Sequence, residues 1–222
     1  MTTVSSDYPD DPIDLDAMLN SYHIPEDAGE FREGLSNILK RIPLNWGRWI
    51  SCDKGWYPLL VELDGKLSEI CSDYEIHQVK EKYATLRYYF EIPNPEPQCI
   101  IDAEASRPAP GAINPKYMRM NETRTLDQQY QLSEWFHTKY MPIFDSEEYK
   151  KQMEDLEPER LRRQDLYRQM NEIVGEYEDI SSRTCEICSE SGSIHNQGYW
   201  LKTLCPTCAE ENHYEKKDSD DE

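Results

Sequence analysis

The sequence predicts an α+β protein with a small helix–hairpin core, a helical arm and a C-terminal module closed by cysteines. Three observations lead to this fold class. Apolar residues change from helical spacing to alternation between residues 55 and 91, helical periodicity returns after residue 125, and two Cys-x-x-Cys pairs stand near the C-terminus. The chain of 222 residues is short for two ordinary domains, so we expect one core with smaller appended segments.

The α+β core is predicted over residues 31–92. Two helices are expected from apolar residues at intervals of three and four, namely Phe31, Leu35, Ile38, Leu39 and Ile42, and then Leu59, Leu60, Leu63, Leu67 and Ile70. Tyr74–Lys82 is expected to be a strand. The alternating residues from Leu86 to Phe90 form its partner, around a tight turn at Tyr83-Ala84-Thr85.

Residues 93–124 are predicted to be a Pro-rich loop, and residues 125–180 a helical region. Six prolines fall in the first segment, which has no apolar periodicity. In the second, Pro142 and Pro158 are expected to divide the chain into three helices, because proline lacks the N–H that a helix interior needs. The last helix carries apolar residues at heptad spacing, which are Leu166, Met170, Ile173, Tyr177 and Ile180. Two heptads favour packing against the chain's own core and leave a homodimer through residues 166–180 as the alternative.

The chain is acidic, with 44 Asp and Glu against 24 Lys and Arg and a formal charge of −20. Residues 1–30, 145–180 and 209–222 carry −8, −6 and −5, so the rest of the chain is close to neutral. We predict a partly disordered acidic segment over 1–30 and an acidic disordered tail over 214–222. This composition argues against direct binding of nucleic-acid phosphates and against an anionic membrane surface. No apolar run is long enough to span a membrane.

Four of the seven cysteines have the spacing of a four-thiolate zinc site. Cys185 and Cys188 form one pair, Cys205 and Cys208 form the other, and sixteen residues separate the pairs. Two residues between cysteines place both sulfurs on one side of a tight turn, and two such turns close a tetrahedron with bonds of about 2.3 Å. We therefore predict a structural Zn2+ in a treble-clef or ribbon-like module over residues 181–213.

Alternatives to this zinc site stay open at the level of the sequence. Two disulfides would need an oxidising compartment, and the acidic N-terminus does not resemble an export signal. A redox dithiol or an iron–sulfur site is a further alternative, and His195 or His213 lies near enough to replace one cysteine ligand. Cys52, Cys71 and Cys99 show no ligand spacing, and Cys71 is expected to be a buried apolar residue.

Segments of the core and of the cysteine region resemble an uncharacterised family of small phage and prophage proteins. The matching segments are Gly55-Trp56-Tyr57-Pro58-Leu59-Leu60, Gln78–Tyr83, Leu86–Phe90, Ser182–Cys185 and Gly198–Cys205. The chain departs from the family pattern at Ala84 and Ser189, where relatives usually have glycine, and by a Pro-rich and helical insertion over roughly 92–165. The resemblance implies a phage or bacterial origin and a cytoplasmic location in a bacterial host cell. It implies no activity.

Motifs of catalysis are scarce. The sequence has no P-loop and no Gly-x-Gly-x-x-Gly, Gly-x-Ser-x-Gly, His-Glu-x-x-His or His-Asn-His pattern, so we predict that the protein is not an enzyme. His77 beside Asp73 and Glu75 is a candidate acid–base group, although a histidine at a sheet edge is the favoured interpretation. Residues 80–87 are expected to form a cross-strand ladder of opposite charges or, alternatively, a polar recognition face.

These features favour a non-enzymatic, acidic zinc protein of phage type that binds a host protein with a basic surface. One alternative is a nucleic-acid mimic that inhibits a host defence nuclease, in the manner of anti-restriction or anti-CRISPR proteins. Another is a nucleic-acid-binding zinc protein, which the few basic residues near the cysteines make less favourable. The residues predicted to contact a partner are acidic and lie in the helical region: Glu147, Glu148, Glu154, Asp155, Glu157, Glu159, Asp165 and Glu172.

Overall fold

The computed structural model describes residues 14–108 and 126–216, which belong to two compact units. The first unit contains the chain up to Pro93 and from Leu166 onward, and the second is Asn94–Asp165. The sequence bounds of the second unit nearly coincide with those of the insertion inferred over roughly 92–165. Helices and small sheets occur together in the described residues, which confirms the predicted mixture of helix and sheet.

Helices α2 (Arg32–Lys40) and α3 (Tyr57–Ile70) form the helical layer of the first unit. Their buried faces are those that the apolar spacing predicted, and Leu35, Leu60 and Leu67 are completely buried. The shorter α1 (Leu15–Asn20) begins after Asp14, whose carboxylate caps the helix by accepting the N–H of Ala17 at 3.0 Å.

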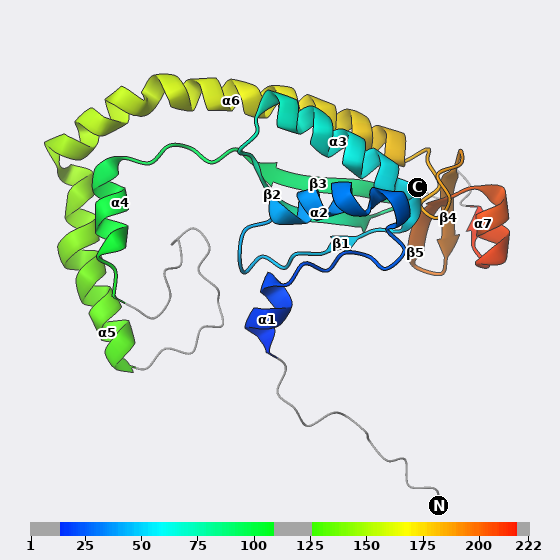
Figure 1. Cartoon of the computed structure of the whole chain (residues 1–222), viewed down its shortest axis with the longest axis horizontal. Helices are drawn as coiled ribbons and strands as arrows, with labels where there is room; N and C mark the ends of the chain where they lie inside the picture. The colour runs from blue at the N-terminus through cyan, green and yellow to red at the C-terminus, as the bar shows by residue number, and fades with distance from the viewer. Residues whose placement is uncertain (1–13, 109–125, 217–222) are drawn as a thin grey trace, which may run out of the picture. The chain divides into compact units, whose positions relative to one another are not determined.

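The sheet of this unit has the strand order β1–β2–β3, and Figure 1 shows α2 and α3 in front of it. β2 (Glu75–Lys82) and β3 (Thr85–Glu91) form the predicted hairpin. Its turn residues, Tyr83 and Ala84, have φ angles of 54° and 62°, the positive values that a two-residue hairpin turn requires. β1 (Ile50–Ser51) pairs in parallel with β2; two residues are too few for a periodic signal, so the sequence did not predict this strand.

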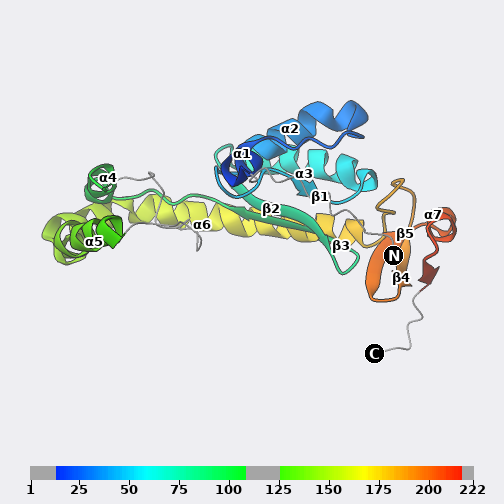
Figure 2. The same ribbon diagram turned by 90° about the horizontal axis from the view of Figure 1, so that it is seen from below.

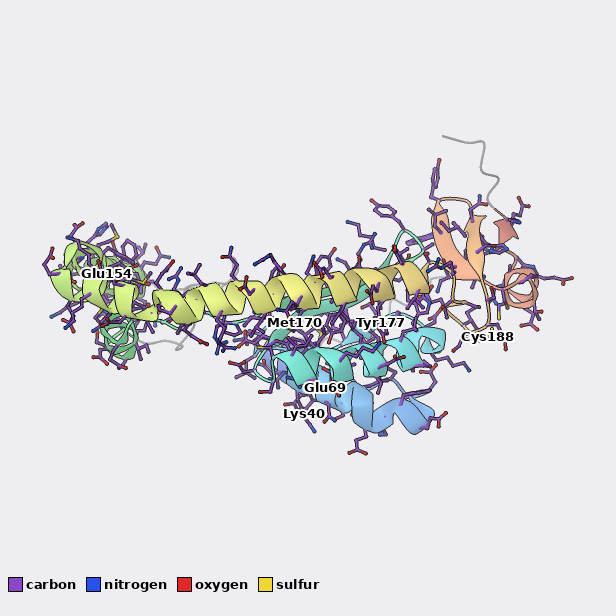
Figure 3. All side chains as sticks on the ribbon, turned by 90° about the horizontal axis from the view of Figure 1, so that it is seen from above. Lys40, Glu69, Glu154, Met170, Tyr177 and Cys188 are labelled. Atoms are coloured by element: carbon purple, nitrogen blue, oxygen red, sulfur yellow. The ribbon has the colours of Figure 1, made fainter. Side chains whose placement is uncertain are left out.

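Helix α6 (Glu147–Ser181) completes the core of the first unit with its C-terminal half. Met170, Val174 and Tyr177 are buried, and Leu166 and Ile173 pack partly against the same core. Figure 3 labels Met170 and Tyr177 on the side of α6 that faces α3. The seam therefore packs against the chain's own core, and the face considered for a homodimer is largely occupied within the chain.

The prediction that Pro158 separates two helices is wrong, because α6 runs through it without a break. A proline inside a helix removes one backbone donor and costs about 3 kcal/mol. Ion pairs along the helix, among them Arg162–Glu159 at 2.6 Å and Arg163–Glu159 at 2.9 Å, offset part of this cost. No helix in the described ranges, α6 included, is both long and apolar enough to cross a bilayer.

A polar network lies inside the first unit. The Asp64 carboxylate accepts hydrogen bonds from Arg41 Nε at 2.9 Å and from the Tyr74 hydroxyl at 2.5 Å, and the Tyr74 hydroxyl lies 2.8 Å from that of Tyr88. Burial, together with the nearby Asp64 charge, raises the pKa of Tyr74 above its ordinary value. The network satisfies buried polar groups and ties α2, α3 and the hairpin together.

The second unit is helical. Its first helix, α4 (Gln98–Ala105), lies inside the segment predicted to be a Pro-rich loop, and it corrects that prediction. Pro97 and Pro108 flank the helix, so no proline interrupts it, while Ile100 and Ala103 are buried. Residues 109–124 of the predicted loop lie outside the described residues. The later helix, α5 (Leu126–Trp135), continues into a π-helical segment at Phe136–Tyr140.

Candidate metal centre

The cysteine module consists of a small sheet and one short helix. β5 (Trp200–Leu204) and β6 (Glu215–Lys216) pair with opposite edges of β4 (Ser193–Gln197), and α7 (Pro206–Glu211) connects β5 to β6 (Figure 1). The module therefore extends past the predicted boundary at residue 213. The prediction of a disordered tail from residue 214 is wrong for the first residues of that tail, because β6 gains backbone hydrogen bonds from β4. Residues 217–222 lie outside the described residues.

The structure brings together the four cysteines predicted to bind metal. The sulfurs of Cys185, Cys188, Cys205 and Cys208 all lie within 4.8 Å of one another, and those of Cys188 and Cys205 are 3.6 Å apart. Four sulfurs around one zinc ion at about 2.3 Å per bond would be separated by roughly 3.8 Å. Three of the four residues are buried, and Cys188 is exposed. This cluster is a candidate site for one metal ion.

Backbone hydrogen bonds hold both Cys-x-x-Cys turns in shape. In the first turn, the N–H of Cys185 donates to Glu190 O at 2.7 Å, and the N–H of Ser189 donates to Cys185 O at 3.0 Å. In the second, Cys205 is the N-cap of α7, and its sulfur accepts the N–H of Cys208 at 3.4 Å. A donor aimed at sulfur favours the thiolate, which is the form that ligates a metal.

The two departures from the phage-family pattern occupy equivalent backbone conformations. Ser189 has a φ of 68° and Ala84 a φ of 62°, both in the left-handed region where glycine is favoured. The Ser189 hydroxyl donates to Gly55 O at 2.8 Å, so the serine gains a contact that glycine could not make. The N–H of Ala84 donates to the Glu81 carboxylate at 2.6 Å. Ser189 and Ala84 therefore both adopt the turn conformation that glycine favours, and a nearby hydrogen bond helps to hold each of them in it.

The first cysteine turn docks onto the start of α3. The N–H of Gly55 donates to Glu186 O at 2.7 Å, and the indole N–H of the fully buried Trp56 donates to Thr184 O at 2.8 Å. A methyl group on Gly55 would collide with the carbonyl oxygen of Cys185. Glycine is thus required here because two backbones approach closely. The sequence reasoning missed this role, although Gly55-Trp56 belongs to the segments that resemble the phage family.

A second contact joins the module to the β2–β3 turn. The Thr203 hydroxyl of β5 donates to Ala84 O at 2.7 Å, and both residues are completely buried. At the end of α6, the Ser181 hydroxyl accepts the N–H of Leu86 at 2.9 Å. The module predicted as an end piece is therefore part of the first unit. Hydrogen bonds between residues more than 90 positions apart hold it there.

An acidic residue inside the first cysteine turn is buried against the core. Glu186 is 1% exposed, and its carboxylate accepts the N–H of Asp53 at 3.2 Å and lies 3.2 Å from Lys202 Nζ. Burial raises the pKa of Glu186, and the ammonium of Lys202 opposes this effect. Burial lowers the pKa of Lys202, but the contacts with Asp53 and Glu186 outweigh it and the net shift is upward. The charges of this cluster hold one another in place.

The other cysteines and histidines considered as ligands lie outside the cluster. A ring nitrogen of the buried His195 is 2.7 Å from Ser193 O, and His213 follows α7 with a φ of 59°. Cys71 ends α3 and is buried, as expected. Burial raises the pKa of the Cys52 thiol, and the charges of Glu186 and Asp53 add to this shift. Cys52 is therefore poorly suited to be a nucleophile.

The structure places His77 in an irregular part of β2, and it contradicts the predicted arrangement of the charged hairpin residues. His77 stacks on Trp46 with ring centroids 4.5 Å apart, and its Nε2 lies 3.5 Å from the Glu91 carboxylate. β2 is the central strand, but β1 pairs only with Val79 and Lys80, and the register with β3 shifts between Ile76 and Gln78, so the structure does not contradict the prediction of a sheet-edge histidine. The predicted ladder of opposite charges is wrong, because the register places Lys80 directly opposite Arg87. The number of residues in the turn decides this register, and a charge pattern alone does not reveal it.

The eight acidic residues predicted to contact a partner all lie on α6, and several are paired within it. Glu147 forms an ion pair with Lys150 at 2.6 Å, and Glu157 forms one with Arg160 at 4.0 Å. Arg162 and Arg163 lower the pKa of Glu159 to about 2. Glu154 and Asp155 are exposed. The structure leaves their role in binding as a prediction.

Comparison with known proteins adds no family or relative to these observations. No family model matches the chain, and no similar protein was found among curated proteins or solved structures. The resemblance to phage proteins therefore stays a sequence-based prediction, and the geometry of the site carries the functional argument.

Substitution of Ser189 tests how the first cysteine turn is held. Ser189→Ala should lower the free energy of unfolding by about 1 kcal/mol, because it keeps the left-handed conformation and loses the bond to Gly55 O. Ser189→Gly loses the same bond but removes the strain, so it should stay within about 0.5 kcal/mol of the natural protein. Urea unfolding of metal-saturated protein measures both. Equal stability of Ala and Ser at this position would show that the hydroxyl contributes nothing.

Proposed function

We propose that the four cysteines bind one structural Zn2+ ion. The observation that carries this proposal is the set of four sulfurs within 4.8 Å of one another. Four thiolates fill a tetrahedral coordination sphere and leave no position for a water, so such a zinc would serve the fold and not catalysis. Elemental analysis of freshly purified, reduced protein should find one zinc per chain. Less than a few tenths of an equivalent of any metal would overturn the assignment.

We further propose that the protein is a non-enzymatic, phage-type interaction protein that binds a host protein with a basic surface. The zinc module supports this by locking the end of the chain onto the core, which presents a fixed surface for recognition. The net charge of −20 supports a basic partner, since opposite charge raises the rate of encounter. A bacterial cytoplasm is the setting that the resemblance to phage proteins implies.

Removing the acidic ends tests the electrostatic part of this proposal. Deleting residues 1–13 and 217–222 removes a formal charge of −3 from each end and brings the chain from −20 to −14, without touching the described fold. Association with the partner captured from a bacterial lysate should become roughly two- to tenfold slower at low salt and less salt-dependent. A variant with scrambled ends of the same composition should behave like the natural chain. Unchanged association after the deletion would show that the ends act only on solubility.

A nucleic-acid mimic is the second candidate, and one feature of α6 favours it. Glu172, Glu176 and Asp179 are exposed at intervals of four and three, which places them on one side of the helix. Such a row of carboxylates can occupy a channel built for phosphates. A mimic must compete with DNA for its partner, and a partner that binds DNA and this chain simultaneously would exclude this candidate. A nucleic-acid-binding zinc protein has less support, because Lys202 in β5 of the module is already paired with Asp53 and Glu186.

A further inference from the structure

The outer face of the β2–β3 hairpin carries lysines and tyrosines in an otherwise acidic protein. Val79, Leu86 and Tyr88 point into the core, so alternate residues point outward. The outward residues include two lysines of β2, two exposed tyrosines and one arginine, and we call them the lysine–tyrosine face: Lys80, Lys82, Tyr83, Arg87 and Tyr89. Figure 2 shows α2 and α3 on one side of the hairpin, and the lysine–tyrosine face is the opposite side.

The two lysines of this face rest on aromatic rings. Lys80 Nζ lies 5.5 Å from the ring centre of Tyr89, and Lys82 Nζ lies 5.3 Å from that of Tyr83. Among the described residues, Lys150 and Lys202 instead form ion pairs with carboxylates, and Lys66 has both a carboxylate and a ring beside it. A lysine on an exposed tyrosine keeps donors turned to solvent, and the ring holds its position. The face therefore presents two ammonium groups, each beside a tyrosine ring.

The register of the hairpin adds an unfavourable charge contact that folding does not explain. Lys80 lies directly opposite Arg87, and like charges in this position destabilise a sheet. Glu178 of α6 relieves part of this repulsion by pairing with Arg87 at 2.9 Å. The intervening acid, Glu81, accepts the N–H of Ala84 within the turn at 2.6 Å. Carboxylates from another molecule would complete the charge balance of this face.

We propose that the lysine–tyrosine face binds an extended acidic segment of another protein. Lys80 and Lys82 are two residues apart on one strand, so their Cα atoms are separated by about 6.6–6.8 Å. Alternate residues of an extended peptide have this same spacing, so two acids separated by one residue match both lysines. The proposal goes beyond the function proposed above, since it assigns a cationic site whose ligand is opposite in sign to a basic host protein.

The structure favours an acidic peptide over two other ligands, a partner strand added to the sheet and a single-stranded nucleic acid. A partner strand cannot extend the sheet at β3, because Ser181 and Glu178 accept the N–H groups of Leu86 and Tyr88. Single-stranded nucleic acid binds to platforms of aromatic rings on which successive bases stack, whereas the lysine–tyrosine face offers two rings, each with an ammonium group beside it. A long polyanion would also meet the repulsion of a chain with a charge of −20.

Titration with defined probes tests this proposal on the full-length, metal-loaded protein. The probes are a labelled ten-residue peptide of alternating Glu and Thr, a paired isomer (Glu-Glu-Thr-Thr-Glu-Glu-Thr-Thr-Glu-Thr) in which no two glutamates are separated by a single residue, and a ten-nucleotide oligo-dT. Fluorescence anisotropy at low salt should show binding of the alternating peptide, with affinity that falls as salt increases. The paired isomer should bind several times more weakly, and oligo-dT should not bind.

Paired variants assign the binding to the lysine–tyrosine face. The double variant Lys80→Gln with Lys82→Gln should lower the affinity for the alternating peptide roughly two- to thirtyfold, because it removes two exposed ion pairs whose effects on affinity multiply. Lys66→Gln is the matched control, because Lys66 lies 5.0 Å from the ring centre of Tyr177 and belongs to helix α3, not to the hairpin. The double variant should melt no lower than the natural protein, since it removes the Lys80–Arg87 repulsion. Absence of peptide binding, equal binding to the double variant or preference for oligo-dT would each overturn the proposal.

Discussion

Removing the metal is expected to unfold the cysteine module and to loosen the start of α3 at the same time. A structural zinc ion supplies about 10–16 kcal/mol of apparent binding free energy in small modules, which matches or exceeds the 5–15 kcal/mol that stabilises a typical domain. The four cysteines bring together the turn whose neighbouring carbonyls, Thr184 O and Glu186 O, accept from Trp56 and Gly55. Without metal, those two hydrogen bonds should open together with the module.

Hydrogen exchange measured by mass spectrometry follows this coupling residue by residue. Chelation of the natural protein, or Cys185→Ser, should speed the exchange of the Gly55 amide, which donates to Glu186 O at 2.7 Å. Cys99→Ser is the matched control, because Cys99 lies in α4 of the second unit and should leave both the metal content and the exchange unchanged. Metal loss without faster exchange at Gly55 would show that the module and the core fold independently.

The local part of the fold and the four metal-site residues could be predicted from the sequence. Helical and alternating periodicities depend only on neighbouring residues, so α2, α3 and the β2–β3 hairpin were recognisable. The cysteine spacing reflects the geometry of tight turns and a tetrahedral ion, and the structure brings all four sulfurs together.

The remaining features depend on contacts between distant parts of the chain. The burial of Glu186 follows from its partners Asp53 and Lys202, which lie 133 and 16 positions away in the sequence. A periodic pattern tells which side of an element is buried, but it does not name the partner that covers that side. The helix α4 was missed for a related reason, since the surrounding prolines gave a stronger local signal than its two buried residues. Glycines required by close approach are equally hidden until the approaching backbone is known.

Gly55→Ala is expected to separate docking of the cysteine module from metal binding. A methyl group at this position would overlap the Cys185 carbonyl oxygen and lie 2.5 Å from that of Glu186, so one backbone must move. Forcing an extra methyl into a packed site costs roughly 1–3 kcal/mol, which corresponds to a fall in Tm of about 3–10 °C for a chain of this size. The four cysteines belong to the module itself, so the variant should still hold one metal ion.

The matched control for this experiment is Gly65→Ala. Gly65 is exposed on α3 and has no atom within 4 Å of an added methyl, so alanine should stabilise the helix by up to about 1 kcal/mol. Urea unfolding of both metal-loaded variants, with metal content measured in parallel, compares the two positions. A Gly55→Ala protein as stable as the natural chain would mean that the docking contact contributes little. A variant that loses its metal would mean that the core shapes the site and that docking cannot be separated from binding, because the Cys185 turn then depends on the Gly55 backbone for its geometry.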